Sequence, residues 1–267
     1  MASRSRLRAA AAIGLLILLT APHQVEAAPS SGLSVAAASD LRFALEEIAR
    51  LFEHGRGIHV RLTFGSSGQL AAQIEQGAPF DLFFSADEEF VMALARNGFV
   101  RPQSVQLYAI GRIVLWVRSA SPLVLTDGVT ALLDERIRFV AIANPAHAPY
   151  GRAAVQALQT AGLYERVRPT LVLGENISQT LQFIQSGNAD IGVVALSLAV
   201  APLVRPTGRS WLIPAYLHRP IRQAAGVVAA SRQGAQAQAF LETLNGPAGR
   251  RVMRQFGFTL PGEPPQP

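Results

Sequence analysis

The sequence predicts an α/β fold in which mostly parallel sheets are flanked by helices. Apolar, strand-like runs alternate with segments whose apolar residues recur at helical spacing, which is the pattern of β–α units. Composition agrees, because 49% of the residues are hydrophobic and 16% are charged, as in a compact chain rather than a disordered one. Several strands are followed by turns rich in Gly and Ser. In sheets of this kind, ligands bind beyond the carboxyl ends of the strands.

The first strand and helix illustrate both patterns. Residues 33–38 form a continuous apolar run, and Leu41, Leu45 and Ile48 then follow at helical spacing. Gly77 and Gly98 are typical of the residues that end helices. The same criteria predict strands at 33–38, 59–64, 82–86, 112–117, 138–143, 170–173, 191–195 and 226–230, and helices at 41–52, 70–77, 88–97, 151–161, 177–186, 235–244 and 247–256.

The chain is long enough for two modest lobes. Without an N-terminal leader about 240 residues remain, which suffices for one large domain or two smaller ones. Segments 108–111 and 214–220 are where we expect the chain to cross between lobes. The expected organisation is a first lobe of residues 28–110 and 219–260, a second lobe of residues 111–218, and a flexible tail at 261–267.

Residues 1–27 have the three-part pattern of a secretory signal peptide. Arg4, Arg6 and Arg8 form a basic head, and residues 9–20 are an apolar run too short to span a bilayer. Small residues then precede the expected cleavage after Ala27. The alternative is a buried N-terminal helix, in which case the basic head and the cleavage pattern would be coincidences.

The absence of cysteine bears on the compartment. No disulfide can form, and no lipid-modified cysteine can anchor the chain. An exported protein without an anchor is retained only behind an outer membrane, so we expect a periplasmic location, with free secretion as the lesser option.

Losing the signal peptide would lower the formal charge from +6 to +4. The basic residues, all arginine, are scattered and form no stripe for nucleic acid.

Four strand-to-helix turns carry the strongest functional signal. They are rich in small and hydroxyl residues, so free backbone N–H groups and hydroxyls converge where helices begin, which is the recipe for an anion site. The turns are residues 36–40, 63–70, 144–151 and 174–178. Taken singly, Ser39, Ser66 and Ser67 would be read as ordinary helix caps. Together, the four turns predict a protein that surrounds an oxyanion.

Two other kinds of site, a metal centre and a hydrolase active site, fit the sequence less well. The five histidines are dispersed, with no metal-binding spacing, so we expect neither a metal site nor a cofactor. A secreted serine hydrolase is a remote alternative, in which Ser66 or Ser67 is the nucleophile and His147 with Asp81 or Asp87 completes a triad. The spacing around these serines does not match G-x-S-x-G, so we expect no enzyme activity.

Across nearly all of the predicted mature chain, the motifs resemble the periplasmic molybdate/tungstate-binding proteins, the soluble receptors of ABC-type importers. Each motif is weak alone, but their order and spacing are specific. They are AAASDL at 36–41, TFGSSGQLAAQIEQGAP at 63–79, DLFFSADE at 81–88, YAIGRIVLW at 108–116, NPAHAPYG at 144–151, GENISQTLQFIQSGNADIG at 174–192 and VALS at 194–197.

The resemblance implies a type II periplasmic binding protein fold, with a cleft that closes on the tetrahedral dianion. It implies hydroxyl and N–H ligands at Ser39 and Ser67, and backbone N–H ligands at Tyr150 and Ile177. Ala195 stands where some relatives have a ligand tyrosine, so the phenol of Tyr150 is a candidate substitute. Asp40 is expected to cap its helix with its side chain, leaving at most its N–H for the ligand.

The resemblance also implies delivery to a membrane permease and its ATPase, and a monomer suits such a receptor. A site made only of donors suits a dianion with four acceptor oxygens, and it disfavours protonated anions, whose O–H needs an acceptor. A receptor of the same fold for sulfate, phosphate or an organic acid is the nearer alternative. The sequence does not rank molybdate against tungstate.

Overall fold

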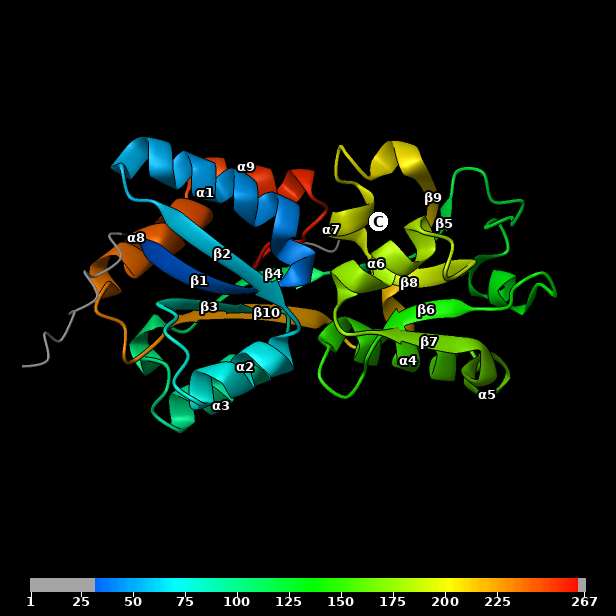
Figure 1. Ribbon diagram of the computed structural model, residues 1–267, viewed down its shortest axis with the longest axis horizontal. Coiled ribbons are helices and arrows are strands. Elements are labelled where there is room, and N and C mark those ends of the chain that lie inside the picture. Colours follow the sequence, from blue (N-terminus) through cyan, green and yellow to red (C-terminus); the bar gives the residue numbers. More distant parts are fainter. Residues whose placement is uncertain (1–31, 264–267) are drawn as a thin grey trace, which may run out of the picture. The chain divides into compact units, whose positions relative to one another are not determined.

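The computed structural model describes residues 32–263, which form two five-stranded sheets with helices on their faces (Figure 1). The predicted signal peptide, its cleavage site at Ala27 and the last four residues of the predicted tail lie outside the described residues. Within that tail, Glu263 accepts hydrogen bonds from the side chains of Arg250 and Arg254.

The first sheet has the strand order β2-β1-β3-β10-β4. Its strands are β1 (Leu33–Ala38), β2 (Val60–Gly65), β3 (Leu82–Ser85), β4 (Gln106–Gly111) and β10 (Ile221–Val227). β1 pairs in parallel with β2 and β3, whereas β10 is antiparallel to both β3 and β4. A strand from the end of the chain is therefore inserted between two strands from its beginning.

The second sheet has the order β7-β6-β8-β5-β9. Its strands are β5 (Ile113–Arg118), β6 (Val140–Ala143), β7 (Leu171–Gly174), β8 (Ile191–Ala195) and β9 (Gly208–Leu212). β6 pairs in parallel with β7 and β8, and β5 is antiparallel to β8 and β9. Both sheets are thus mixed, but in each of them one strand alone, β10 in the first sheet and β5 in the second, runs against the other four. The expectation of mostly parallel sheets flanked by helices is confirmed in this sense. The antiparallel pairings arise where the chain passes from one sheet to the other and back.

Helices cover both faces of each sheet (Figure 1). The helices α1, α8 and α9 lie on one face of the first sheet, and α2 and α3 lie on the other. In the second sheet, α4 and α6 pack on β6 and β8. The helices are α1 (Arg42–Arg56), α2 (Ser67–Glu75), α3 (Glu88–Arg96), α4 (Pro149–Thr160), α5 (Tyr164–Val167), α6 (Ile177–Gln185), α7 (Leu196–Ala199), α8 (Gly234–Asn245) and α9 (Pro247–Gln255).

Short 3₁₀ turns complete the described secondary structure. They are η1 (Ser39–Leu41), η2 (Pro102–Ser104), η3 (Gly128–Leu133), η4 (Arg168–Thr170), η5 (Arg205–Thr207) and η6 (Ala215–Leu217). The first of these matters most, because η1 links β1 directly to α1 and so sets where Ser39 and Asp40 lie.

Alternating side chains of the first sheet fill two cores. Val35 and Phe84 belong to a large cluster with α1 and α8, whereas Ala36 and Phe83 pack in a smaller cluster with α2 and α3. This is the two-residue period of a strand buried on both faces. It explains why the 33–38 run is continuously apolar rather than alternating.

The chain passes between the sheets twice. β4 ends at Gly111 and β5 begins at Ile113 in the other sheet, and residues 213–220 lead from β9 back to β10. The second passage matches the expected crossing segment. Residues 108–111, the other expected crossing, instead form the end of strand β4. The exact lobe boundaries stay a prediction.

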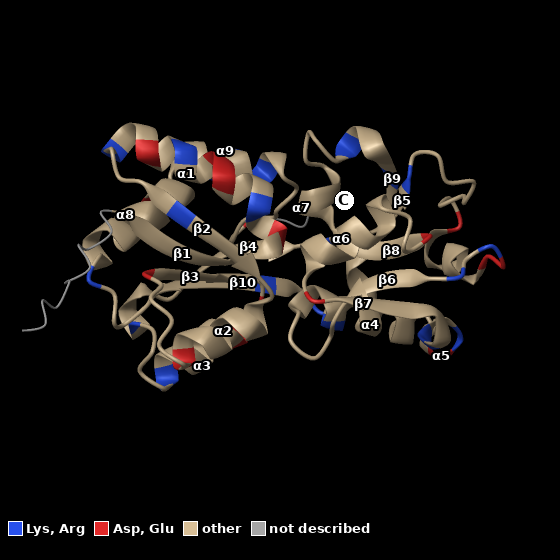
Figure 2. Cartoon of the chain, viewed as in Figure 1, with Lys and Arg blue, Asp and Glu red and all other residues tan. Residues whose placement is uncertain are grey.

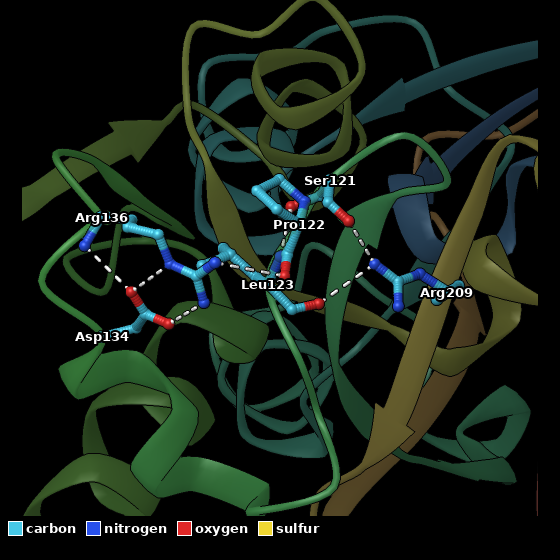
Figure 3. Close-up of polar contacts among 6 residues, drawn as sticks. All are labelled: Ser121, Pro122, Leu123, Asp134, Arg136 and Arg209. Atoms are coloured by element: carbon cyan, nitrogen blue, oxygen red, sulfur yellow. Dashed lines mark hydrogen bonds and ion pairs between the residues drawn. The ribbon is translucent and has the colours of Figure 1, made fainter.

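Two arginines hold the long connection from β5 to β6 (Figure 3). Arg209 on β9 donates from Nη2 to the carbonyl oxygens of Ser121 at 2.5 Å and Leu123 at 3.0 Å. Arg136 donates to both carboxylate oxygens of Asp134, at 2.8 and 2.5 Å. These hydrogen bonds fix the connection in a segment that forms no strand.

Charged residues lie mostly on the helices and loops, and the strands carry few (Figure 2). Among residues 32–263, no helix is long and apolar enough to cross a membrane.

Candidate functional site

The five residues singled out from the sequence line one small cavity. Ser39, Asp40 and Ser67 come from the first sheet's connections, and Tyr150 and Ile177 come from the second's. Each of the five is at most 3% exposed. The remaining lining residues are Ala38, Gly65, Ser66, Ala86, Ala148 and Pro149. The cavity volume is about 10 Å³, so a tetraoxyanion can be admitted only if the lining residues move apart.

Two serines supply the first sheet's side of the cavity. Ser39 follows β1 as the first residue of η1, and Ser67 follows β2 as the first residue of α2. Their N–H groups therefore lie at helix starts, where no acceptor exists within the helix. The Ser67 hydroxyl accepts a hydrogen bond from the N–H of Ala86 at 2.9 Å, so its own proton is available for an acceptor in the cavity.

The second sheet presents two helix N-termini. Pro149 opens α4, which suits proline because the first helical N–H has no partner anyway. Tyr150 is the next residue, and Ile177 is the first residue of α6. Asn176 caps α6 by accepting from the N–H groups of Ser178 and Gln179, both at 3.1 Å. The Ile177 N–H is left for another acceptor.

The expectation that Asp40 caps its helix was wrong. Asp40 lies inside η1, and η1 has no side-chain cap; the N-cap position belongs to Ala38. The Asp40 Oδ2 atom instead accepts from the phenol of Tyr150 at 2.9 Å and from Nε2 of Gln223 at 2.8 Å. The Tyr150 O–H therefore already makes a hydrogen bond to Asp40. The backbone N–H of Tyr150 is the donor that is left for a ligand.

Burial raises the pKa of Asp40 from 3.8 to about 7, even though the hydrogen bonds from Gln223 and Tyr150 favour the ionised form. The pKa values of Tyr150 and Tyr108 are also raised, first by their own burial and then by the nearby Asp40 charge. Both phenols therefore remain protonated donors. The Asp40 Oδ1 atom is buried and has no hydrogen-bond partner among residues 32–263.

Gln223 and Tyr108 are functional neighbours that sequence reasoning missed. Gln223 lies on β10 and donates to both Asp40 and the Tyr150 oxygen, while Tyr108 on β4 donates to Gln223 Oε1 at 2.7 Å. Gly111 makes room for this group, because a Cβ there would lie 2.2 Å from the Tyr150 hydroxyl oxygen. No motif marks Gln223, and the YAIGRIVLW motif contains Tyr108 without indicating its role, because β10 joins the two residues only through the sheet order.

Hydrogen bonds across the cavity join the two halves of the site. The Ser39 hydroxyl donates to Asn176 Oδ1 at 3.1 Å, and Ser178 Oγ donates to the Ser39 carbonyl at 3.0 Å. Ser197 donates to the Asp40 carbonyl at 2.7 Å. The Gly68 N–H donates to the His147 carbonyl at 3.0 Å. These contacts hold the halves in a closed arrangement, and opening the cavity breaks them.

The contact between Ser66 and His147 is not arranged as in a hydrolase. Gln69 donates from Nε2 to Glu175 at 2.6 Å, so its Oε1 faces Ser66 and accepts the serine proton at 3.0 Å. His147 Nδ1 lies 2.8 Å from Ser66 Oγ and must be the donor in that contact. A nucleophilic serine would instead donate its proton to the histidine.

The proposed acids of that triad are also engaged elsewhere. Asp81 accepts from Ser34 N–H and from the Ser231 hydroxyl, and Asp87 pairs with Arg152. The carboxylate nearest His147 is Glu175, whose Oε2 lies 3.6 Å from Nε2.

Two further expectations concern the position of Ala195 and the absence of a metal site. Ala195 ends β8, paired with Ile113, and is buried outside the cavity lining. Within residues 32–263, no group of three or more His, Cys, Asp or Glu side chains is placed to hold a metal ion. The cavity therefore offers hydroxyl and N–H donors together with one buried carboxyl group, which suits an oxyanion bound through its oxygens.

The fold and the cavity define a bacterial solute receptor: residues 33–259 match the model of the bacterial extracellular solute-binding proteins, and the chain belongs to that family. It is 38% identical over 249 residues to the molybdate-binding protein ModA of Rhodobacter capsulatus, covering 93% of this chain and 94% of the relative. It is 36% identical to ModA of Azotobacter vinelandii, covering 97% and 98%.

Comparison with solved structures gives the same family of folds. The Azotobacter vinelandii periplasmic molybdate-binding protein superposes with a TM-score of 0.81 at 35% identity, covering 86% of this chain and 99% of that one. The sulfate-binding protein SubI of Mycobacterium tuberculosis has a TM-score of 0.69 at 16% identity, a likeness of fold alone. The two-lobed periplasmic binding protein fold expected from the sequence is thus confirmed.

Proposed function

We propose that this chain binds molybdate or tungstate in the periplasm and delivers it to an ABC importer. The observation that carries the proposal is the convergence of helix N-termini and serine hydroxyls from both sheets on one buried cavity. The identities of 38% and 36% to two ModA proteins, over nearly their whole length, support molybdate as the ligand class.

The proposed ligand donors are Ser39, Ser67, Tyr150 and Ile177, with Asp40 beside them. The two serines contribute hydroxyl and N–H groups, the Ser39 hydroxyl by turning its proton from Asn176 Oδ1 to the ligand. Tyr150 and Ile177 contribute N–H groups at helix starts. Each such bond to a dianion contributes about 1.5–3 kcal/mol, so a set of six or seven outweighs the loss of hydration. All contact the oxygens, and none contacts the metal atom.

The transport role follows from the same proposal. The receptor is made with a signal peptide cleaved after Ala27, acts as a monomer with lobes 28–110 plus 219–260 and 111–218, and presents its closed form to the permease and its ATPase. No catalysis is involved. Support for the export step comes from the family, whose members are extracellular solute-binding proteins, and from the basic head and apolar run at the N-terminus.

Thermal unfolding of the mature protein with molybdate, tungstate, sulfate or phosphate tests the function. An anion at a thousand times its dissociation constant stabilises the fold by about 4 kcal/mol, which raises the midpoint by several degrees. We expect that shift with molybdate and tungstate only. A shift with sulfate or phosphate would assign the same site to another anion, and no shift with any of them would contradict the proposal. Labelling of Ser66 or Ser67 by a fluorophosphonate probe would favour a hydrolase instead.

A further inference from the structure

Asp40 is the one carboxyl group among the residues that line the cavity. It is 1% exposed, and within the described part of the chain its Oδ1 atom has no hydrogen-bond partner. A buried carboxylate next to a bound dianion is repelled strongly, because little water screens the two charges. A site built for an oxyanion is therefore expected to neutralise this group or to exclude it.

Among residues 32–263, no cationic side chain is hydrogen-bonded to the Asp40 carboxyl group. The Asp40 side chain accepts from the neutral side chains of Tyr150 and Gln223, and the Asp40 carbonyl accepts from Ser197. The backbone N–H groups of Asp40 and Leu41 also favour the ionised carboxyl, but they carry no charge. The helices α6 and α7, which pack against η1, carry no ionisable side chain. Charged side chains on the other adjoining elements have partners of their own: Arg42 with Glu46, Arg152 with Asp87, and Arg222 with Glu88. Tyr108 and Tyr150 are the titratable groups whose pKa values the Asp40 charge raises, after their own burial.

The hydrogen-bond pattern shows which oxygen can take a proton. Oδ2 accepts two donors, from Tyr150 and Gln223, and it keeps them whether or not the other oxygen is protonated. Oδ1 is the oxygen without a partner. A proton on Oδ1 removes the charge and turns the only acceptor-only side chain of the cavity lining into a donor.

We propose that Asp40 is protonated on Oδ1 when the oxyanion is bound and donates a hydrogen bond to it, so that binding takes up one proton. This inference rests on the proposed function and adds a specificity element to it. A protonated carboxyl group favours a fully deprotonated oxyanion, which offers an acceptor to every donor of the cavity. The raised pKa of Asp40 keeps the required proton accessible near neutral pH.

The test is titration calorimetry with sodium molybdate at pH 8.0, repeated in buffers of different ionisation enthalpy. The dependence of the observed heat on the buffer gives the number of protons taken up. For the wild-type protein we expect close to one proton per molybdate, and a dissociation constant that rises about tenfold per pH unit above pH 7.5. Asp40→Asn, whose amide is a neutral donor of the same shape, should bind molybdate without proton uptake and without that pH dependence.

Asp81→Asn is the control, because Asp81 is a half-buried carboxylate of the first sheet that contacts Ser34 and Ser231 away from the cavity. It should keep the proton uptake. Molybdate binding with no proton uptake by the wild-type protein, or equal uptake by Asp40→Asn, would overturn the inference while leaving the proposed function intact. Failure of the wild-type protein to bind molybdate or tungstate at any pH would overturn both.

Discussion

At the scale of single residues, the hydroxyl of Ser67 is the clearest ligand donor. It is fully buried, lines the cavity and receives a hydrogen bond from the Ala86 N–H, so its proton is oriented away from that group. Replacing Ser67 with Ala should weaken molybdate binding by roughly 1–3 kcal/mol, because one ligand oxygen loses its donor. Titration calorimetry measures the change directly.

Ser104→Ala is the matched control for that substitution. Ser104 is also a buried serine of the first sheet's connections, and its hydroxyl accepts the N–H of Val227 at 2.8 Å. Both variants lose a hydroxyl that accepts a backbone N–H, so both should lose some stability. Only Ser67→Ala should bind molybdate more weakly than the wild-type protein. If the two variants bind molybdate with equal affinity, Ser67 is not a ligand.

Asp40 also predicts how stability depends on pH. Its pKa is about 7 in the folded protein against 3.8 ordinarily, so the folded state binds the proton more tightly. The stabilisation is complete below about pH 4 and is lost as the pH rises to about 7. Relative to Asp40→Asn, the wild-type free energy of unfolding should fall by about 4 kcal/mol across this range. Urea unfolding at a series of pH values measures it, and parallel curves for the two proteins would contradict the prediction.

Most of the residues that line the cavity could be predicted from the sequence, and the reason is physical. Turns between a strand and a helix lie at the carboxyl edge of a sheet, so Ser39, Ser67, Tyr150 and Ile177 could be expected to share one region. Their burial around one cavity agrees with that expectation, and their role as ligands stays a prediction. Gln223 could not be expected there, because its position depends on where β10 inserts in the sheet.

At the scale of elements, Asn176 has two roles, as the cap of α6 and as the acceptor for the Ser39 hydroxyl. Asn176→Ala should lower the free energy of unfolding by about 0.5–2 kcal/mol, the usual loss for a capping residue. It should also weaken oxyanion binding, because the Ile177 N–H lies in the turn that the cap orders. Denaturant unfolding and titration calorimetry on the same variant measure the two effects.

Ser186→Ala provides the comparison at the other end of α6, where Ser186 donates to the Phe183 carbonyl on an exposed surface. It should change neither quantity measurably. Loss of stability without loss of affinity in Asn176→Ala would show that the α6 N-terminus does not contact the ligand.

Periodicity predicts most of the elements. For the elements that it does not predict, the structure shows the reason. The strand β1 and the helix α6 were predicted to within a residue, since an apolar run and a capped amphipathic segment are strong local signals. The edge strands β4 and β9 were missed. No residue of β9 is fully buried, and its Arg209 and Ser210 are exposed. Residues 108–111 of β4 fall in an expected crossing segment, so neither strand has the sequence pattern of a buried strand.

At the scale of the whole molecule, the cavity predicts an opening motion. The closed arrangement leaves a volume of about 10 Å³, and contacts such as Ser39–Asn176 and Tyr150–Asp40 bridge its two sides. Access for a tetraoxyanion requires these to part, and the bound ion then holds them together, as in hinge-closing receptors. Small-angle scattering should show a smaller radius of gyration with saturating molybdate, and identical profiles would count against closure.

The insertion of β10 between β3 and β4 has a consequence for how the chain reaches its native state. All strands of the second sheet lie within residues 113–212, so that sheet can be completed from one continuous stretch of chain. The first sheet cannot, because β4 has no neighbour in it until residues 221–227 arrive. Contacts between such distant segments form slowly. Assembly is therefore expected to begin with the half that lies in the middle of the sequence and to finish with the half that contains both of its ends.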